Sequence, residues 1–438
     1  MLKEEKFELM DAKGVRNFLP EDKIPRQKIM DMLRETFELF GFSPLETPAI
    51  ERLDVLTAKF GAGEASDVAK EIFQLTDQGE RSLGLRFDLT VPMAKVVGMN
   101  PNLNMPFKRY QMQPVWRDGP IKLGRYREFW QCDVDIVGVE SMLADAEIIS
   151  ILDYVFTKMD FKFVIKANNR KLLNGIIEYA GYKDYSMKAI ISIDKLAKIG
   201  RDGVRDELLD LGFDKPEIKK LLDSIDIKGT NSEILDKVSK FVKTEEGKEG
   251  IKELRELIEF CESMGVQNLR IDLSLARGLE YYTGPVFEVY LEDSKITSSV
   301  AGGGRYDKMI GMYLGGKKNY PATGVSFGIE PIYEAMKLSG KTEPVKTTTE
   351  AFIIPIGKNL PDALKLSARL RERGINTETD LMKRGISKNL SYLNSMGIPY
   401  AIFVGEREVA EGRFTVRDMK TGEEKKIESD KIPGVIKR

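Results

Sequence analysis

Two basic, strand-like arms joined by a turn carry the residues best suited to chemistry. The segment covers residues 115–135 and places Arg117 and Arg125 on opposite arms. Guanidinium groups that converge in this way suit an oligophosphate, because each is planar, permanently charged and able to donate two parallel hydrogen bonds. The segment therefore predicts a phosphate clamp. A surface hairpin held by cross-strand salt bridges is the alternative interpretation.

The second arm also presents acidic side chains. Alternate residues of a strand point to opposite faces, so Gln131, Asp133 and Asp135 are expected on one face. Cys132 and Val134 then point to the other face. The pattern predicts an amide and two carboxylates beside the phosphate clamp.

Two shorter segments add polar candidates. Asp88 and Thr90 are two residues apart, and on a shared strand face they could hold an ammonium group; a solvated strand face is the alternative. Residues 301–307 contain three adjacent glycines followed by Arg305. No Gly-Lys-Ser/Thr ends this run, so it is not a phosphate-binding loop. It indicates backbone packed closely against a ligand or another strand.

A third segment, residues 275–284, surrounds an arginine with tyrosines and glycines. Arg277 directly precedes Gly278, and Tyr281 and Tyr282 lie between Gly278 and Gly284, two glycines that permit close backbone approach. The segment predicts part of a binding pocket, and a bulged hairpin is the alternative.

The composition narrows the chemistry further. None of the 438 residues is histidine, which excludes Ser-His-Asp and Cys-His catalytic pairs, histidine metal sites and an imidazole general base. Lys and Arg number 68 against 69 Asp and Glu, so a wholly basic nucleic-acid coat is excluded but a local basic face is not. Catalysis must rely on other side chains, backbone groups or the substrate.

The cysteines and the hydropathy pattern indicate the compartment. Cys132 and Cys261 form no CxxC pair, which favours a reducing environment without a disulfide framework or a zinc site. Residues 1–6 are mostly charged and hold no apolar signal core, and no stretch approaches the ~20 apolar residues of a membrane helix. We therefore expect a soluble, cytoplasmic protein with no membrane segment.

The candidate site residues lie in regions whose expected secondary structure differs. Apolar residues at helical spacing predict a helix over residues 20–40, ended by Gly41. Residues 83–155 and 268–330 alternate as strands, and Lys/Glu-rich segments with helical periodicity fill residues 170–262. A helical block thus separates two strand-rich blocks that hold all of the candidate side chains.

The C-terminal part has a different pattern. A polar stretch at residues 339–349 is typical of a linker. Beyond it a βαβ pattern predicts a small α/β domain with parallel strands. The expected strands are 351–356, 375–378, 400–404, 413–417 and 425–427, and the expected helices are 360–373 and 386–397. Residues 350–438 carry 17 Lys and Arg against 13 Asp and Glu, which points to an anionic partner.

These segments, with residues 14–20, resemble in type and order the signatures of the histidyl-tRNA synthetases, a family of class II aminoacyl-tRNA synthetases. The resemblance implies an α/β protein with an α+β catalytic domain, whose antiparallel class II sheet is flanked by helices. It also implies a helical insertion and a C-terminal α/β anticodon-binding domain. The implied boundaries are 1–169 and 263–340 for the catalytic domain, 170–262 for the insertion and 349–438 for the anticodon-binding domain.

The implied activity is that of a histidine–tRNA ligase. ATP and L-histidine form histidyl-adenylate, and the histidyl group passes to the 3′ end of tRNA(His), with Mg²⁺ accompanying ATP. The resemblance further implies a homodimer formed through residues 22–40 and the following strand, and an insertion that clamps the tRNA acceptor arm.

Six residues are implied to form the histidine pocket: Asp88, Thr90, Gln131, Asp135, Tyr281 and Tyr282. The first three would hold the α-ammonium group. Asp135 and Tyr282 would bind the two ring nitrogens, and Tyr281 would line the pocket.

Arginines are implied at the phosphates. Arg117 would bind the α-phosphate, and Arg277 would lie between the substrate carboxylate and the α-phosphate as the cationic catalytic group. Arg125 and Arg305 would bind ATP through its outer phosphates. Carboxylate attack on an α-phosphate gains charge on phosphoryl oxygens, so it needs positioning and electrostatic preorganisation and no protein base. No protein metal ligand is implied.

Two positions depart from the family pattern. Class II synthetases usually have Arg-x-Glu where this chain has Arg117-Asp118-Gly119, so the Glu is missing and Asp118 is the candidate substitute. Pro331 stands where the family commonly has an arginine that grips the γ-phosphate. We expect Pro331 at the first position of a helix, and Arg125, Lys122 or Arg305 in the role of the missing arginine; weak affinity for ATP is the alternative.

Two alternative functions belong to other classes. Non-catalytic paralogues serve as regulatory subunits of ATP phosphoribosyltransferase, and these typically lack the anticodon-binding domain and erode the active site. This chain keeps residues 349–438, Arg117 and Arg277. A sensor of tRNA or histidine is the second alternative, supported only by Pro331.

Overall fold

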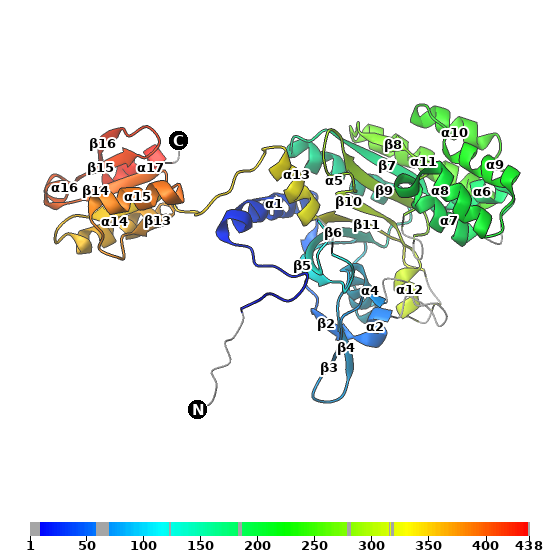
Figure 1. Cartoon of the computed structure of the whole chain (residues 1–438), viewed down its shortest axis with the longest axis horizontal. Helices are drawn as coiled ribbons and strands as arrows, with labels where there is room; N and C mark the ends of the chain where they lie inside the picture. The colour runs from blue at the N-terminus through cyan, green and yellow to red at the C-terminus, as the bar shows by residue number, and fades with distance from the viewer. Residues whose placement is uncertain are drawn as a thin grey trace. The chain divides into compact units, whose positions relative to one another are not determined.

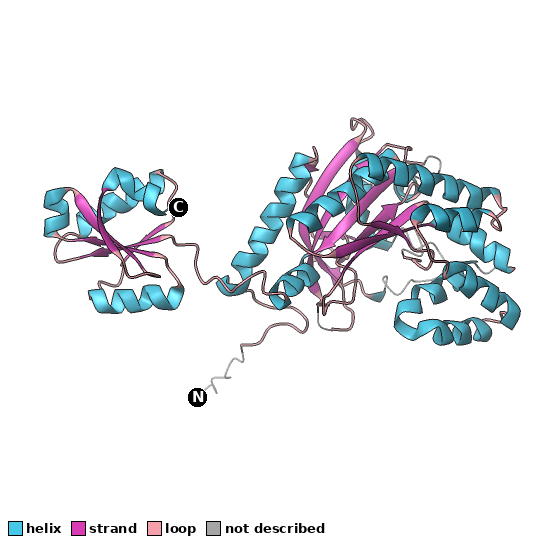
Figure 2. Ribbon diagram, turned by 90° about the horizontal axis from the view of Figure 1, so that it is seen from above, coloured by secondary structure: helices cyan, strands magenta, loops and turns pink. Residues whose placement is uncertain are grey.

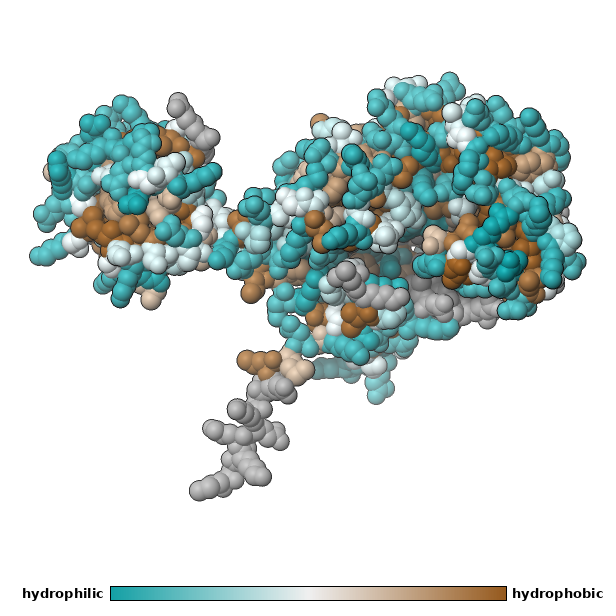
Figure 3. Space-filling view, turned by 45° about the horizontal axis from the view of Figure 1, so that its top comes forward, coloured by the Kyte–Doolittle hydropathy of each residue, from teal (hydrophilic) through white to brown (hydrophobic). Residues whose placement is uncertain are grey.

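The computed structural model describes residues 9–57, 70–121, 124–182, 186–277, 282–314, 316 and 319–436. The chain forms two compact units (Figure 1). The larger comprises Met1–Arg16 and Ile29–Lys341, and the smaller comprises Asn17–Lys28 and Thr342–Arg438. Figure 3 shows hydrophilic residues over most of the visible face of each unit, with hydrophobic residues in small patches.

Within the described residues, the larger unit is built on an eight-stranded sheet in the order β1-β5-β6-β11-β10-β9-β7-β8. The pairs β1–β5 and β7–β8 at the two edges are parallel, and the pairs between them are antiparallel. The strands are β1 (Ser43–Pro44), β5 (Phe107–Trp116), β6 (Glu128–Val137), β7 (Phe163–Asn169), β8 (Leu269–Ile271), β9 (Pro285–Leu291), β10 (Ala301–Arg305) and β11 (Ala322–Gly328). A smaller sheet contains β2 (Ile50–Arg52), β4 (Ser82–Leu85) and β3 (Gln74–Thr76).

Helices cover one face of the large sheet, as Figure 2 shows for the larger unit. These helices are α5 (Leu143–Lys158), α13 (Ile329–Leu338) and the part of α1 (Pro20–Leu39) from Ile29 onward. Cys132, Val134 and Ile136 of β6 point into this core, as the alternation predicts. Phe327 of β11 stacks on Phe156 of α5, with ring centroids 6.0 Å apart. The opposite face of β6 is left for polar side chains.

The prediction of strands throughout residues 83–155 is wrong in two places. Thr90–Met99 form the helix α4, and α5 is also helical. Both helices are strongly apolar and buried on several sides. Such helices lack the polar stripe that reveals a helical period, so their sequences resemble buried strands. The helix predicted at residues 20–40 is confirmed as α1, and Gly41 follows it with φ +76°.

A helical block follows β7 in the larger unit. Its described helices are α6 (Arg170–Ala180), α7 (Ser186–Asp194), α8 (Leu196–Asp210), α9 (Lys215–Ile225), α10 (Asn231–Ser239) and α11 (Glu245–Ser263). Asn169, the last residue of β7, caps α6 by accepting a hydrogen bond from the Lys171 backbone N–H. The helical periodicity noted for residues 170–262 therefore corresponds to helices.

The smaller unit has a five-stranded sheet in the order β13-β12-β14-β15-β16. β12 is parallel to β13 and β14, as predicted, whereas β15 is antiparallel to both of its neighbours. Its elements are β12 (Ala351–Pro355), α14 (Leu360–Glu372), β13 (Thr377–Thr379), α15 (Ile386–Met396), β14 (Tyr400–Val404), α16 (Glu406–Glu411), β15 (Arg413–Asp418), β16 (Glu424–Glu428) and α17 (Ile432–Ile436). In the described part of the chain, no helix has the length and apolar character needed to cross a membrane.

Candidate functional site

A cavity of about 170 Å³ opens on the polar face of the large sheet. β6, β10 and β11 form its floor, and its walls come from the segment before α4, from Arg117 just after β5 and from the segment before β9. Gln131, Asp133 and Asp135 line the cavity from β6, as the alternation predicts. The register pairs Asp133 with Ser326 and Asp135 with Gly324, so β11 presents small residues beside the β6 acids.

The cavity brings together predicted residues that are distant in sequence. Seven of them line it: Asp88, Thr90, Arg117, Gln131, Asp135, Arg277 and Tyr282. Arg125 and Arg305 are not among the lining residues. Tyr281 and Lys122 lie outside the described residues. The catalytic and binding roles assigned to these side chains stay predictions.

Asp88 and Thr90 do not share a strand face, because Thr90 is the first residue of α4. Asp88 Oδ1 accepts a hydrogen bond from the Val91 backbone N–H at 3.0 Å, which fixes this carboxylate at the helix N-terminus. A helix start therefore brings the two side chains to the cavity in place of a strand.

Asp135 is held at the acidic end of the cavity by two buried partners. Its Oδ2 lies 2.7 Å from Arg109 Nη2, and its Oδ1 accepts a hydrogen bond from the Tyr306 hydroxyl. Burial raises the pKa of Asp135, and the Arg109 charge opposes that shift. A Cβ at Gly324 would lie 2.0 Å from Asp135 Oδ1, so the carboxylate needs glycine there.

Sequence reasoning missed Arg109 and Tyr306. The available signal was the alternation of Arg109, Gln111 and Gln113 along β5, which marks a polar strand face. Both Arg109 and Gln111 are fully buried. A strand that buries polar side chains indicates that those side chains orient the residues of a binding site.

Asp133 is a third acid at this end; the alternation predicts it on this face, but the family resemblance assigned it no role. It is 3% exposed, and its Oδ1 has no hydrogen-bond partner among the described residues. Burial raises its pKa to about 7; Arg109 opposes the shift and Asp135 adds to it. Gln131 donates to Ser326 Oγ at 2.9 Å, and Gln131 Oε1 also lacks a partner within the described residues. These oxygens suit a ligand that brings N–H donors.

Arginines define the other end of the cavity. Arg117 Nε donates to the Phe87 carbonyl at 3.0 Å, and its guanidinium lies over the Phe129 ring, 5.1 Å from the centroid. Arg277 enters from the segment before β9 and forms an ion pair with Glu288. Two guanidiniums at one end suit a carboxylate and a phosphate.

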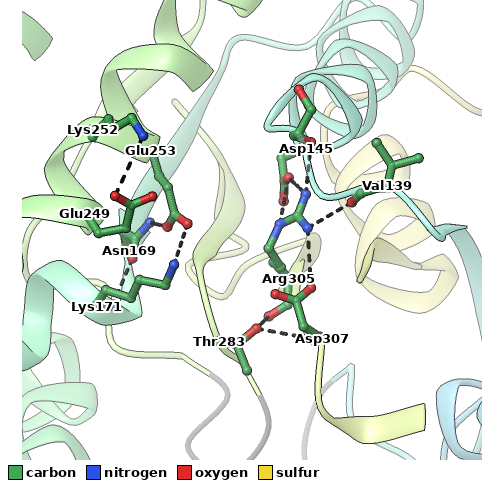
Figure 4. Close-up of polar contacts among 11 residues, drawn as sticks. Val139, Asp145, Asn169, Lys171, Glu249, Lys252, Glu253, Thr283, Arg305 and Asp307 are labelled. Atoms are coloured by element: carbon green, nitrogen blue, oxygen red, sulfur yellow. Dashed lines mark hydrogen bonds and ion pairs between the residues drawn. The ribbon is translucent and has the colours of Figure 1, made fainter. Parts of the chain in front are cut away.

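Arg305 is held in the interior by several polar partners, and the predicted contact with ATP stays a prediction. It is 2% exposed, and its Nε lies 3.0 Å from Asp145 Oδ2 (Figure 4). The Val139 carbonyl accepts from Nη1 at 3.0 Å and the Ser141 carbonyl from Nη2 at 3.1 Å, while Asp307 Oδ1 lies 3.3 Å from Nη1. These partners lie outside the set of residues that line the cavity.

The remaining phosphate candidates lie at the surface. Arg125 is about half exposed and pairs with Glu71 Oε1 at 3.1 Å. Pro331 is the third residue of α13 and not the first, because the helix begins at Ile329. The first four backbone N–H groups of a helix have no intrahelical partner, so proline is tolerated there.

A largely antiparallel sheet whose polar face carries a cavity lined by acids and arginines is the arrangement expected of a class II aminoacyl-tRNA synthetase. The family described as histidyl-tRNA synthetase matches residues 14–332, and an anticodon binding domain matches residues 350–438. The chain belongs to the histidyl-tRNA synthetase family, and aminoacyl-tRNA ligase activity follows from this membership.

Relatives and solved structures agree with that assignment. The chain is 41% identical to histidine–tRNA ligase 1 of Bacillus cereus over 96% of this chain and 98% of the relative. It is 40% identical to histidine–tRNA ligase 2 of Shouchella clausii over 96% and 99% of the two chains. The crystal structure of histidyl-tRNA synthetase from Nostoc sp. PCC 7120 matches with a TM-score of 0.88, 32% identity and coverage of 99% and 100%. These matches do not favour a regulatory subunit without ligase activity.

Proposed function

We propose that this chain activates L-histidine with ATP in the cavity and transfers the histidyl group to the 3′ end of tRNA(His). One observation carries the proposal: Asp88, Asp133 and Asp135 line the same cavity as Arg117 and Arg277, although these residues come from three separate parts of the sequence. An amino acid carries the complementary groups, an ammonium group for the acids and a carboxylate for the arginines.

At the acidic end, Asp88, Thr90 and Gln131 hold the α-ammonium group. The partnerless Oδ1 of Asp133 supplies a further acceptor for it. Asp135 and Tyr282 bind the ring nitrogens, with Asp135 oriented by its pairing to Arg109 and Tyr306. A site that binds the substrate through buried polar groups rejects analogues that leave those groups unpaired.

At the basic end, Arg117 binds the α-phosphate and Arg277 bridges that phosphate and the histidine carboxylate. Negative charge builds up on the phosphoryl oxygens as the carboxylate attacks and pyrophosphate leaves, and both guanidiniums stabilise that charge. No side chain has to remove a proton from the carboxylate, so a chain without histidine has the groups that this step needs.

Several finer assignments belong to the same proposal. Arg125 contacts the outer phosphates of ATP from the rim, and Mg²⁺ enters as part of the ATP substrate, where it offsets phosphate charge. Among the described residues, no group of three or more Asp, Glu or Cys side chains is arranged to hold a metal ion. The C-terminal unit binds the anticodon, and the enzyme acts as a homodimer in the cytoplasm, where the free thiols of Cys132 and Cys261 stay reduced.

ATP–pyrophosphate exchange with a panel of amino acids tests the proposal. We expect exchange with histidine alone, and about a 100- to 1,000-fold lower rate in Arg277→Ala, on the scale of losing one preorganised donor. Arg201→Ala is the matched control, since Arg201 is a similarly exposed, ion-paired arginine on the helical block. Absence of histidine-dependent exchange at saturating ATP would refute the proposal.

A further inference from the structure

Glu288 lies beside the cavity and does not line it. We propose that it is a positioning residue that holds Arg277 in the orientation required for adenylate formation. The inference rests on the role proposed above for Arg277. Glu288 would act on the reaction only through that arginine, because it lies outside the set of residues that line the cavity.

Both carboxylate oxygens of Glu288 have side-chain partners. Oε1 forms the ion pair with Arg277 Nη1 and also accepts a hydrogen bond from Ser299 Oγ at 3.1 Å. Ser299 Oγ in turn lies 3.3 Å from Arg277 Nη1. Oε2 accepts a hydrogen bond from the Tyr290 hydroxyl. Burial and the Glu288 charge raise the pKa of Tyr290, so this hydroxyl remains a donor at neutral pH.

The sheet register supplies the surface on which Arg277 rests. Glu288 on β9 is paired directly with Gly302 on β10. A Cβ at Gly302 would lie 2.5 Å from Arg277 Nη1, so the guanidinium occupies the space that the missing side chain leaves. Arg277 is thus bounded by Gly302 beneath it and by Glu288 and Ser299 beside Nη1.

This arrangement fixes a side chain that would otherwise be flexible. The Arg277 side chain is 37% exposed, whereas that of Glu288 is 10% exposed, so the buried acid is the better-ordered partner. A guanidinium holds its five N–H donors in one plane, and a contact at Nη1 therefore sets the direction of the others. Donors aligned before the substrate arrives stabilise the transition state without the cost of reorganisation.

A double-mutant cycle distinguishes positioning from a general structural role. In Glu288→Ala we expect kcat for ATP–pyrophosphate exchange to fall about 100-fold, the scale of a small misplacement of a catalytic group. The histidine KM should change by less than about 3-fold. Glu288→Ala combined with Arg277→Ala should be no slower than Arg277→Ala alone, because both changes remove the same interaction.

The conservative variant Glu288→Gln should recover part of the kcat that Glu288→Ala loses, since its amide oxygen still accepts a hydrogen bond from Arg277 Nη1.

Glu253→Ala is the matched control. Glu253 is 8% exposed, like Glu288, and pairs with Lys171 away from the cavity (Figure 4). Its effect on exchange should be small and should multiply with that of Arg277→Ala, as expected for independent sites. Thermal unfolding of every variant identifies changes that act through stability.

The outcomes separate the proposed catalytic role of Arg277 from the proposed positioning role of Glu288. If Arg277→Ala keeps its exchange activity, the role of Arg277 is wrong. If Arg277→Ala is inactive but Glu288→Ala has a normal kcat, or multiplies with Arg277→Ala, the positioning role is wrong. Should Glu288→Ala fail to fold, Gly302→Ala decides, because its added Cβ meets only the end of the Arg277 side chain among the closest atoms. We expect it to fold with a lowered kcat, and a wild-type kcat would overturn the inference.

Discussion

The two ends of the cavity are built differently. At the acidic end, Asp135 and Arg109 are almost fully buried and are paired with each other. At the basic end, the Arg277 side chain is 37% exposed and Arg117 is half-buried. The residues proposed to recognise the amino acid thus belong to the hydrogen-bonded interior of the fold, whereas those proposed for the phosphates extend from its surface. Changes at the first end should cost stability as well as activity, and changes at the second should cost mainly rate.

The largest effect is expected for Asp135→Ala. The change leaves Arg109 buried without its carboxylate, which typically costs about 3–5 kcal/mol in the free energy of unfolding. Urea unfolding measures this loss, and histidine-dependent exchange should disappear as well. Arg117→Ala is the comparison at the basic end, with an expected stability change below about 1 kcal/mol and a large loss of exchange. Equal losses of stability in the two variants would remove the distinction between the ends.

An intermediate effect is expected from the titration of Asp133. Its pKa in the folded protein, about 7, lies above the usual range, so folding favours the neutral carboxyl. The resulting stabilisation is complete at low pH and is lost as the pH rises through about 7. Relative to Asp133→Asn, the free energy of unfolding of the ligand-free protein should fall by up to about 1.4 kcal/mol per pH unit between about pH 5 and 7.

Histidine binding should show the opposite dependence, because an ammonium ligand requires the ionised carboxylate. The histidine KM of the wild-type protein should therefore rise below about pH 7. Free histidine titrates in the same range, so the informative quantity is the KM ratio between the wild type and Asp133→Asn. A ratio that does not change with pH would show that Asp133 does not contact the ammonium group.

The smallest effect is expected for Arg125→Ala. Arg125 is half exposed and already pairs with Glu71, so its net contribution to ATP binding is reduced by solvent and by that competing acid. We expect the ATP KM to rise by about 2- to 5-fold with kcat unchanged, and the effect to shrink at high salt. A loss of about 100-fold would place Arg125 among the central phosphate ligands.

The sequence predicted those parts of the fold whose periodicity is clear. The alternation along β6 correctly separated Gln131, Asp133 and Asp135 from the apolar residues between them, because one face of this strand is buried in the core. The helical block and the βαβ pattern of the smaller unit were also predicted. α4 and α5 were not, since burial on several sides removes the polar stripe from their sequences.

The site was predicted less completely, for a different reason. Arg109 and Tyr306 contact Asp135 from β5 and from the residue after β10, and Glu288 pairs with Arg277 from the segment before β9. A local sequence pattern contains no information on which buried groups will pair.

Arg305 illustrates the same difficulty. It stands in a segment that resembles a family signature, and the segment alone does not reveal that the side chain is buried beside Asp145. Only the three-dimensional surroundings distinguish these roles.

The pairing of Arg305 with Asp145 also constrains how this sequence can change. The two residues are 160 positions apart, and both are almost fully buried. Replacing either alone would leave an uncompensated charge at a cost of about 3–5 kcal/mol, a large share of the roughly 5–15 kcal/mol that keeps a protein folded. Neither position can drift independently, so in diverging descendants of this chain the two residues should be kept or exchanged together.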